Sequence, residues 1–180
     1  PLFRSASMSE LTFRNATEED VGLILEFIKK LADYEKRLDE VIATEDDLEM
    51  WIFERHQAEV IFALEGGVEI GFALFFLSFS TYLGNANLHL EDLFIDPEFR
   101  GKGYGKALLK KLAKIVVERG YGRFEWTCLS WNQPSIDFYL SLGAKQMDWN
   151  VFHLTGDELE RLADEKSGVK SLITLLFLIY

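Results

Sequence analysis

The sequence is poor in cysteine, in clustered histidine and in long apolar runs, and each shortage excludes a class of protein. Its single cysteine, Cys128, cannot form an intramolecular disulfide and suits a reducing cytoplasm. The three histidines, His56, His89 and His153, do not show a metal-ligand spacing, so we expect no metal site. No stretch of about 20 apolar residues occurs, so we expect no membrane-spanning helix.

Positive charge is also scarce, because the 180 residues carry a net charge of −11. Surfaces that bind nucleic acid are basic, so we expect no nucleic-acid partner. The scarcity is uneven: residues 100–119 contain seven of the 19 Lys and Arg residues and one acidic residue. The solvated face of a helix accounts for Lys110, Lys111 and Lys114, but it leaves the neighbouring glycines unexplained.

Those glycines occupy alternate positions at the start of the basic segment, directly before an amphipathic pattern that predicts a helix over residues 103–119. Glycine inside a helix costs roughly 1 kcal/mol relative to alanine. Free N–H groups at a helix N-terminus bind phosphate, and glycine lets the backbone approach the oxygens closely. We therefore predict a pyrophosphate site. Its loop consists of Arg100, Gly101, Lys102, Gly103, Tyr104, Gly105 and Lys106.

The spacing excludes two common phosphate loops. In a Walker A sequence Ser or Thr follows the lysine, whereas Ala107 follows Lys106 here and the glycine spacing also differs. The dinucleotide-binding fingerprint requires a glycine where Lys106 stands, and it follows the first strand of its domain rather than the fourth.

The remaining patterns predict an α/β domain with a mixed sheet, in the order β-α-α-β-β-β-α-β-α-β. The expected strands are residues 11–14, 59–64, 68–79, 87–95, 124–129 and 151–154. Helices are expected from Thr17, Thr44, Gly103, Asn132 and Thr155, and Thr155 opens a capping box. We expect one domain over residues 8–166. Residues 1–7 resemble a cloning scar, and residues 167–180 form an apolar tail of undetermined status.

Three motifs, in order, resemble the GCN5-related N-acetyltransferase (GNAT) family and are most similar to its diamine (spermidine/spermine) acetyltransferases. The motifs are Leu90-Glu-Asp-Leu-Phe-Ile95, Arg100-x-x-Gly103-x-Gly105 and Trp131-Asn-Gln-Pro-Ser-Ile-Asp-Phe-Tyr139. The resemblance extends from Leu11 to about Lys166. It implies a mostly antiparallel sheet of six to seven strands flanked by helices, acetyl-coenzyme A as the acetyl donor, and a homodimer.

The strand over residues 87–95 changes phase in its middle. Leu88 and Leu90 alternate properly, but Glu91 and Asp92 are adjacent acids and apolar residues follow them without a break. A β-bulge produces such a slip, and the resemblance implies a bulge that separates the fourth strand from the fifth. The cofactor's pantetheine arm would lie in that gap. There it would bond the backbone of Leu93, Phe94 and Ile95 and have its thioester carbonyl polarised by an N–H group.

Two residues are candidates for proton transfer. An alkyl ammonium is only about one part in 10³ neutral at pH 7, so a base is useful, and Glu91 is the candidate. Two acids at an exposed strand end are the plain alternative, and base and cation-binding roles remain open for Glu91. The resemblance makes Tyr139 the acid that protonates the departing thiolate, although a tyrosine there also suits a core position. Cys128 is expected to pack inside a strand, so we expect direct transfer in a ternary complex.

Further site residues come from the resemblance. Asn132 would contact the cofactor as well as cap its helix, and Ser135 would join it. Tyr34, Glu35, Glu91, Asp92 and Trp126 would line the amine pocket. Residues 33–49 contain eight acids and two bases, which suits a cationic substrate, although such a segment is more commonly a solvated loop. The chain is shorter than the diamine enzymes after Gly143-Ala144 and lacks their paired acids before Trp149, so the pocket suits a shorter or different amine.

The sequence therefore predicts a cytoplasmic acetyl-coenzyme A-dependent N-acetyltransferase that acts on a small cationic amine: a diamine, a polyamine or a lysine-like molecule. Acetylation of a protein or peptide amine is the alternative within the same class, and it would need a wide groove rather than an acidic pocket. A catalytically silent acyl-coenzyme A sensor would keep the glycine loop and lose Glu91 or Tyr139, whereas both residues are present.

Overall fold

The structure, a computed structural model, describes residues 10–164. The segments 1–7 and 167–180, which the sequence set apart as a scar and an apolar tail, lie outside the described residues. The chain divides into two compact units, one ending at Leu129 and the other beginning at Ser130. The single domain over residues 8–166 stays a prediction.

The first unit is built on a sheet whose strands are β1 (Leu11–Asn15), β2 (Glu59–Glu65), β3 (Val68–Ser80), β4 (Asn85–Ile95) and β5 (Arg123–Trp126). The strands follow the order β1-β2-β3-β4-β5. Each adjacent pair from β1 to β4 is antiparallel, and β5 runs parallel to β4. The predicted mixed, mostly antiparallel sheet is confirmed.

The predicted number of six to seven strands is wrong for residues 10–164, which contain five. The expected strand over residues 151–154 is not formed, and the one over residues 124–129 ends at Trp126. Val151, Phe152 and Leu154 are exposed. An apolar pattern marks a face that a sheet could bury, but a strand also requires the hydrogen bonds of a neighbour, which the pattern does not supply.

The helices begin close to where their caps predict. In the first unit they are η1 (Glu18–Asp20), α1 (Val21–Tyr34), η2 (Leu38–Glu40), α2 (Glu45–Leu48) with its π-helical continuation η3 (Glu49–Glu54), η4 (Pro97–Phe99) and α3 (Tyr104–Glu118). The second unit holds α4 (Gln133–Ser141) and α5 (Gly156–Ala163). The Thr44 hydroxyl accepts a hydrogen bond from the Asp47 N–H at the start of α2. Thr155 is the N-cap residue of α5, but its side chain makes no capping hydrogen bond, so the capping box expected there is not formed.

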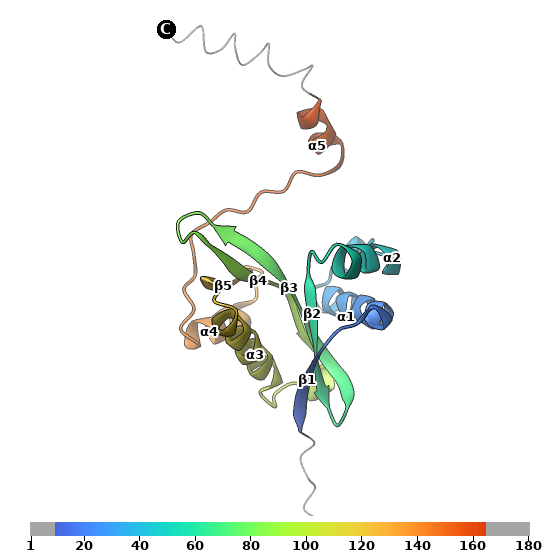
Figure 1. Ribbon diagram of the computed structural model, residues 1–180, viewed down its shortest axis with the longest axis vertical. Coiled ribbons are helices and arrows are strands. Elements are labelled where there is room, and N and C mark those ends of the chain that lie inside the picture. The colour runs from blue at the N-terminus through green and yellow to red at the C-terminus, as the bar shows by residue number, and fades with distance from the viewer. Residues whose placement is uncertain (1–9, 165–180) are drawn as a thin grey trace, which may run out of the picture. The chain divides into compact units, whose positions relative to one another are not determined.

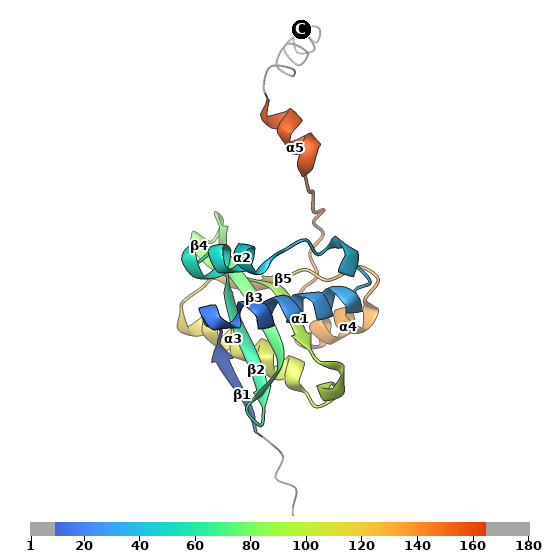
Figure 2. The same ribbon diagram turned by 90° about the vertical axis from the view of Figure 1, so that its right-hand side faces the viewer.

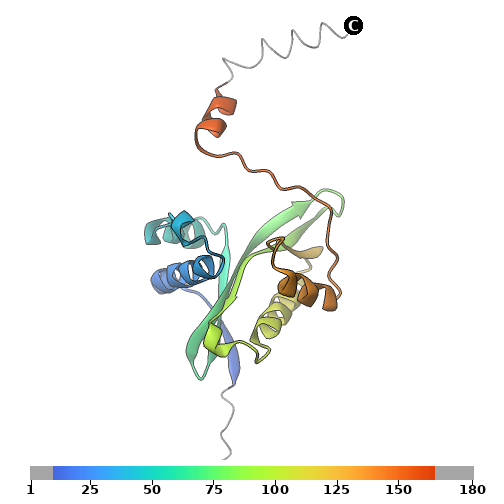
Figure 3. The same cartoon turned by 180° about the vertical axis from the view of Figure 1, so that it is seen from behind.

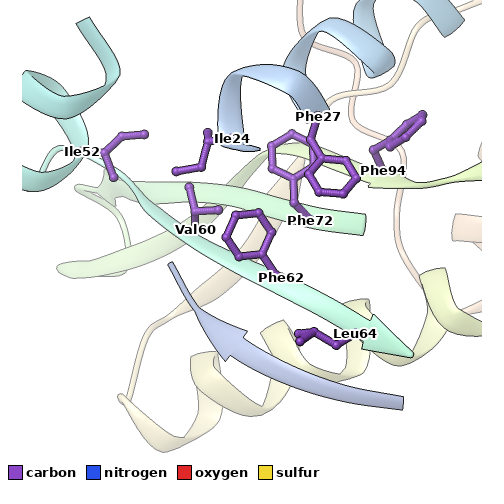
Figure 4. Close-up of a cluster of buried hydrophobic side chains, with 8 residues drawn as sticks. All are labelled: Ile24, Phe27, Ile52, Val60, Phe62, Leu64, Phe72 and Phe94. Atoms are coloured by element: carbon purple, nitrogen blue, oxygen red, sulfur yellow. The ribbon is translucent and has the colours of Figure 1, made fainter. Parts of the chain in front are cut away.

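Two layers of helix cover the sheet of the first unit. Figures 1 and 3 show α1 and α2 on one face and α3 on the opposite face, and Figure 2 shows α1 crossing the strands. We call these the α1 face and the α3 face. The aromatic core lies under α1 (Figure 4), where Phe27 stacks on Phe72 with ring centroids 5.5 Å apart. Side chains alternate between faces along a strand, so Leu74, Phe76 and Ser78 share the α1 face with Phe72.

Candidate active site

β4 carries a bulge at Glu91. Leu90 and Asp92 pair with consecutive residues of β3, so Glu91 is the additional residue in the ladder between them. The parallel pairing with β5 ends at Leu90, whereas β4 continues to Ile95. The predicted bulge and the separation of the fourth and fifth strands are therefore confirmed.

A glycine loop joins the end of β4 to α3. Gly101 and Gly103 have φ angles of 78° and 81°, in the left-handed region that glycine adopts without strain. A Cβ atom at either position would meet nothing within 4 Å, so the loop surface is open. Among the backbone bonds at the start of α3, the Ala107 N–H donates to the Gly103 carbonyl. The N–H groups of the first turn before Ala107 have no acceptor inside the helix.

The basic side chains of the loop differ in what they contact. Arg100 Nε donates to the Ile95 carbonyl oxygen at 2.9 Å, so Arg100 closes the loop back onto β4. Lys102 Nζ lies 3.0 Å from the Glu65 carboxylate at the end of β2. Lys106 is exposed on the first turn of α3. Two of the basic side chains in this loop, Arg100 and Lys102, therefore contact other parts of the protein, whereas Lys106 is exposed to solvent.

Glu65 was not identified by the sequence analysis. Its carboxylate accepts a hydrogen bond from the Tyr104 hydroxyl as well as pairing with Lys102, and these contacts hold the pKa of Glu65 below its ordinary value. Glu65 thus links the β2–β3 hairpin to the glycine loop. One acidic residue at a strand end gives no sequence signal for such a role.

Arg100 also connects the loop to the end of α1. Its guanidinium lies 4.7 Å from the ring centroid of Tyr34 and 5.2 Å from that of Phe94. Tyr34, a predicted pocket residue, is therefore positioned by the loop that is predicted to hold the cofactor.

Asp92 interacts with two other predicted pocket acids. Burial, together with the negative charges of Glu91 and Glu35, raises the pKa of Asp92 to about 7. Glu91 differs from its neighbour, because its side chain is 56% exposed. The bulge of β4 and the C-terminal end of α1 thus combine an exposed carboxylate with a partly buried carboxyl whose pKa lies near neutral pH.

Trp126 does not share the face of these acids. Leu90 and Asp92 lie opposite adjacent residues of β3 and so point to opposite faces of the sheet. Trp126 pairs with Leu90, which places it on the α3 face, where its ring packs against Phe124 at a centroid distance of 4.9 Å. Asp92 lies on the α1 face.

Cys128 is not a buried strand residue, so its expected packing is corrected. β5 ends two residues earlier, and Cys128 is exposed. Partial desolvation of the thiol, together with the charge of Glu35, raises the pKa of Cys128 above its ordinary value. A raised pKa keeps a thiol protonated and disfavours its use as a nucleophile.

The third motif lies in the second unit, at the start of and along α4. Asn132 caps this helix, because its Oδ1 accepts a hydrogen bond from the Ser135 N–H at 3.4 Å, and Pro134 stands in the first turn as predicted. Tyr139 is half-buried, with its ring 5.6 Å from that of Phe138.

Residues 10–164 contain no group of three or more His, Cys, Asp or Glu side chains arranged to hold a metal ion. Across the same residues, no helix combines the length and the apolar character needed to cross a bilayer.

Comparison with known proteins identifies the family. The Acetyltransferase (GNAT) family profile matches residues 25–144. The thialysine N-epsilon-acetyltransferase of Sus scrofa is 34% identical over 169 residues, covering 87% of this chain and 99% of that protein. The spermidine/spermine N(1)-acetyltransferase-like protein 1 of Homo sapiens is 30% identical over 175 residues, covering 91% of this chain and 25% of that protein.

A solved structure supports the same assignment. An integron cassette protein from the mobile metagenome of V. cholerae superposes with a TM-score of 0.71 at 28% identity, covering 86% of this chain and 98% of the other. Together with the family match, the bulged strand and the glycine loop confirm the resemblance that the three motifs indicated. The chain belongs to the Acetyltransferase (GNAT) family and is an N-acetyltransferase.

Proposed function

We propose that the protein transfers the acetyl group of acetyl-coenzyme A to a primary amine of a small cationic acceptor, by direct transfer in a ternary complex. The acceptor is a diamine, a polyamine or a lysine-like molecule. The bulge of β4 carries this proposal, because it places Glu91 and Asp92 on the strand that leads into the glycine loop, where Asp92 interacts with Glu35 at the end of α1.

The residues around the loop fit a diphosphate. Gly101 and Gly103 adopt left-handed backbone conformations and have no side chain to cover the loop. The first turn of α3 offers N–H groups and a positive dipole end. The proposed cofactor contacts are Leu93, Phe94, Ile95 and residues 100–106, with Asn132 and Ser135 added from the third motif. When bound, acetyl-coenzyme A supplies the activated acetyl thioester.

The acceptor side is proposed from charge. The negative charges of Glu91 and Glu35 raise the proton affinity of Asp92, and a cation placed beside these carboxyl groups offsets that repulsion. The distal ammonium of a diamine or of a lysine-like molecule meets that need. Tyr34 is proposed to line the pocket as well, where its aromatic face adds cation–π attraction. Trp126, on the α3 face, is not proposed to contact these acids.

The names of the relatives agree with this acceptor class, since thialysine, spermidine and spermine all carry more than one amino group. Because the chain is shorter after Gly143-Ala144 than the diamine enzymes, we propose that an amine shorter than spermidine, or a different amine, is the preferred acceptor.

The proton-transfer roles follow from the two environments. Glu91, exposed at the bulge, accepts a proton from the acceptor ammonium so that the neutral amine attacks. Asp92, partly buried beside it, binds the acceptor's second charge. Tyr139 is proposed as the acid that protonates the departing thiolate, a role that rests on its motif. A homodimer and a cytoplasmic location complete the proposal.

The test is a coenzyme A release assay with putrescine, spermidine, lysine, thialysine and a histone-like peptide. Turnover is expected with the small amines, and activity on the peptide alone would overturn the acceptor assignment. Tyr139→Phe and Glu91→Gln are each expected to lower kcat about 100-fold or more with little change in acetyl-coenzyme A affinity. Glu54→Gln, at an exposed glutamate outside the site, serves as the matched control. Unchanged turnover in either site variant removes the role assigned to that residue.

A further inference from the structure

A row of polar side chains crosses the α1 face of the sheet beside the bulge. His89 pairs with Phe76 of β3 and with Glu125 of β5, and Asn87 pairs with Ser78. Phe76 and Ser78 stand two and four residues after Leu74 on β3, so the three side chains share one face of the sheet. Leu74 lies opposite Asp92, and the row therefore occupies the same face as the acidic pocket. The row therefore continues the candidate active site across three strands.

His89 lies between two carboxylates. Its Nε2 is 3.8 Å from Glu91 Oε2, and its Nδ1 is 3.5 Å from Glu125 Oε1. The ring stacks on Phe76 with centroids 4.7 Å apart, which fixes the ring plane. The imidazole side chain is 20% exposed, so solvent reaches it. The Nε2 atom of the His89 imidazole thus faces Glu91, the proposed base, and the Nδ1 atom faces Glu125.

Glu125 is held as an ionised acceptor. Its carboxylate accepts hydrogen bonds from the Ser78 hydroxyl and from Arg123 Nε, the latter at 2.7 Å. Although partial burial opposes it, this bonding keeps the pKa of Glu125 below its ordinary value. Fully buried Asn87 donates to the Ser78 hydroxyl at 3.5 Å and so supports the arrangement from behind.

A carboxylate that accepts from one imidazole nitrogen decides which nitrogen carries the proton. Glu125 therefore favours the tautomer with its hydrogen on Nδ1 and leaves the Nε2 lone pair of His89 directed towards Glu91. We infer that His89 receives the proton that Glu91 removes from the acceptor amine and releases it to solvent, with Glu125 as the residue that orients the imidazole.

The step is balanced without any other reactant. An N–H bond of the acceptor ammonium breaks as an O–H bond forms on Glu91; that O–H bond then breaks as an N–H bond forms on His89 Nε2. The resulting imidazolium lies between two carboxylates, which stabilises its charge, and it returns to neutral imidazole by giving one proton to water. In reference compounds an imidazole holds a proton about 2 pKa units more tightly than a carboxylate, so the transfer runs in the required direction.

His89 acts through Glu91 and is therefore a relay and positioning residue rather than a catalytic one. The charged groups that face the His89 imidazole are Glu91 on β4 and Glu125 on β5, and Arg123 pairs with Glu125. The inference rests on the proposed function, because it assigns a route to the proton that Glu91 is proposed to accept.

The test compares pH profiles of kcat/KM for the acceptor amine, measured in the full chain. His89→Gln, which keeps polarity but cannot carry the proton, is expected to lower kcat/KM about tenfold at pH 7 and to approach the unsubstituted protein at pH 9, where hydroxide accepts the proton. The KM for acetyl-coenzyme A is expected to stay unchanged. His56→Asn is the control, because His56 is exposed, has a φ of 51° that asparagine tolerates, and lies outside the site.

A second variant separates relay from packing. His89→Ala, which removes the ring, is expected to regain activity as free imidazole is added, whereas Glu91→Gln is not. In a Glu91→Gln background, His89→Gln should cause no further loss. An unchanged pH profile in His89→Gln, or no rescue of His89→Ala, overturns the relay while Glu91→Gln remains impaired. Full activity in Glu91→Gln overturns the proposed base itself, so the two failures are distinguishable.

Discussion

Gly71 of β3 lies so close to Phe94 of β4 that a Cβ atom on Gly71 would stand 2.3 Å from the Phe94 carbonyl oxygen. The same Cβ would also stand 2.6 Å from the Ile95 side chain. The two strands are in contact here without space for any side chain, and this is the end of β4 whose backbone is proposed to receive the cofactor.

Gly71→Ala is accordingly expected to lower the free energy of unfolding by about 2 kcal/mol or more, since the clash is with backbone and must move a strand. The matched control is Gly22→Ala in α1, where the added Cβ would meet only the flexible end of Glu45 at 3.4 Å. That change should be neutral or stabilising by up to about 1 kcal/mol, because alanine favours a helix. Urea unfolding of both variants measures the difference, and equal stabilities would contradict the packing argument.

The glycine loop gives a prediction about binding. Gly103→Ala forces a side chain into the left-handed region at a φ of 81°, and is expected to cost about 1 kcal/mol of local strain. Because the strained backbone also carries the proposed phosphate contacts, the KM for acetyl-coenzyme A should rise about tenfold or more while kcat changes less. Gly120→Ala has the same kind of strain, a φ of 70°, at the other end of α3 and should leave this KM unchanged. Equal KM values for the two variants would remove the loop from the binding site.

The local features of the site were predictable from the sequence, and the reason is physical. A bulge disturbs the alternation of polar and apolar residues along a strand, so Glu91 could be identified. A glycine loop before a helix consists of consecutive residues, so Gly101 to Lys106 could be identified as well. Contacts between distant residues leave no such trace. Glu65 and Tyr104 are 39 positions apart, and neither is unusual in its own segment.

The errors have the same origin. The apolar pattern of residues 151–154 indicates a strand, but a strand forms only where a partner strand elsewhere in the chain is available to pair with it. Cys128 was expected inside a strand because the predicted strand extended over residues 124–129, yet β5 ends at Trp126. His89 was noted only as a scattered histidine, since its importance depends on Glu125, which a different strand supplies.

Asp92 predicts an unusual dependence of stability on pH. Its pKa is about 7 in the folded protein and 3.8 in an unconstrained side chain, so the folded state binds the additional proton between these values. Stability from this group is fully present below about pH 4 and is lost as the pH rises through 7. Asp92→Asn should remove the loss and make the protein at least about 2 kcal/mol more stable than the unsubstituted chain at pH 8, while the two differ little at pH 4. Chemical denaturation at both pH values measures this, and an Asp92→Asn variant that is less stable at pH 8 would contradict the raised pKa.

Arg14 and Asp20 predict the opposite behaviour at acid pH. The Arg14 guanidinium holds both oxygens of Asp20, at 2.7 and 2.8 Å, and this hydrogen bonding lowers the pKa of Asp20 to about 2. A lowered pKa means that the stabilisation is present above the ordinary value of 3.8 and is lost as the pH falls towards 2. Asp20→Asn is therefore expected to cost about 2 kcal/mol at pH 7 and almost nothing at pH 2. Asp39→Asn, at an exposed acid, is the control and should be neutral at both values. A cost for Asp20→Asn that persists undiminished at pH 2 would show that the residue acts by packing at the start of α1 rather than through its charge.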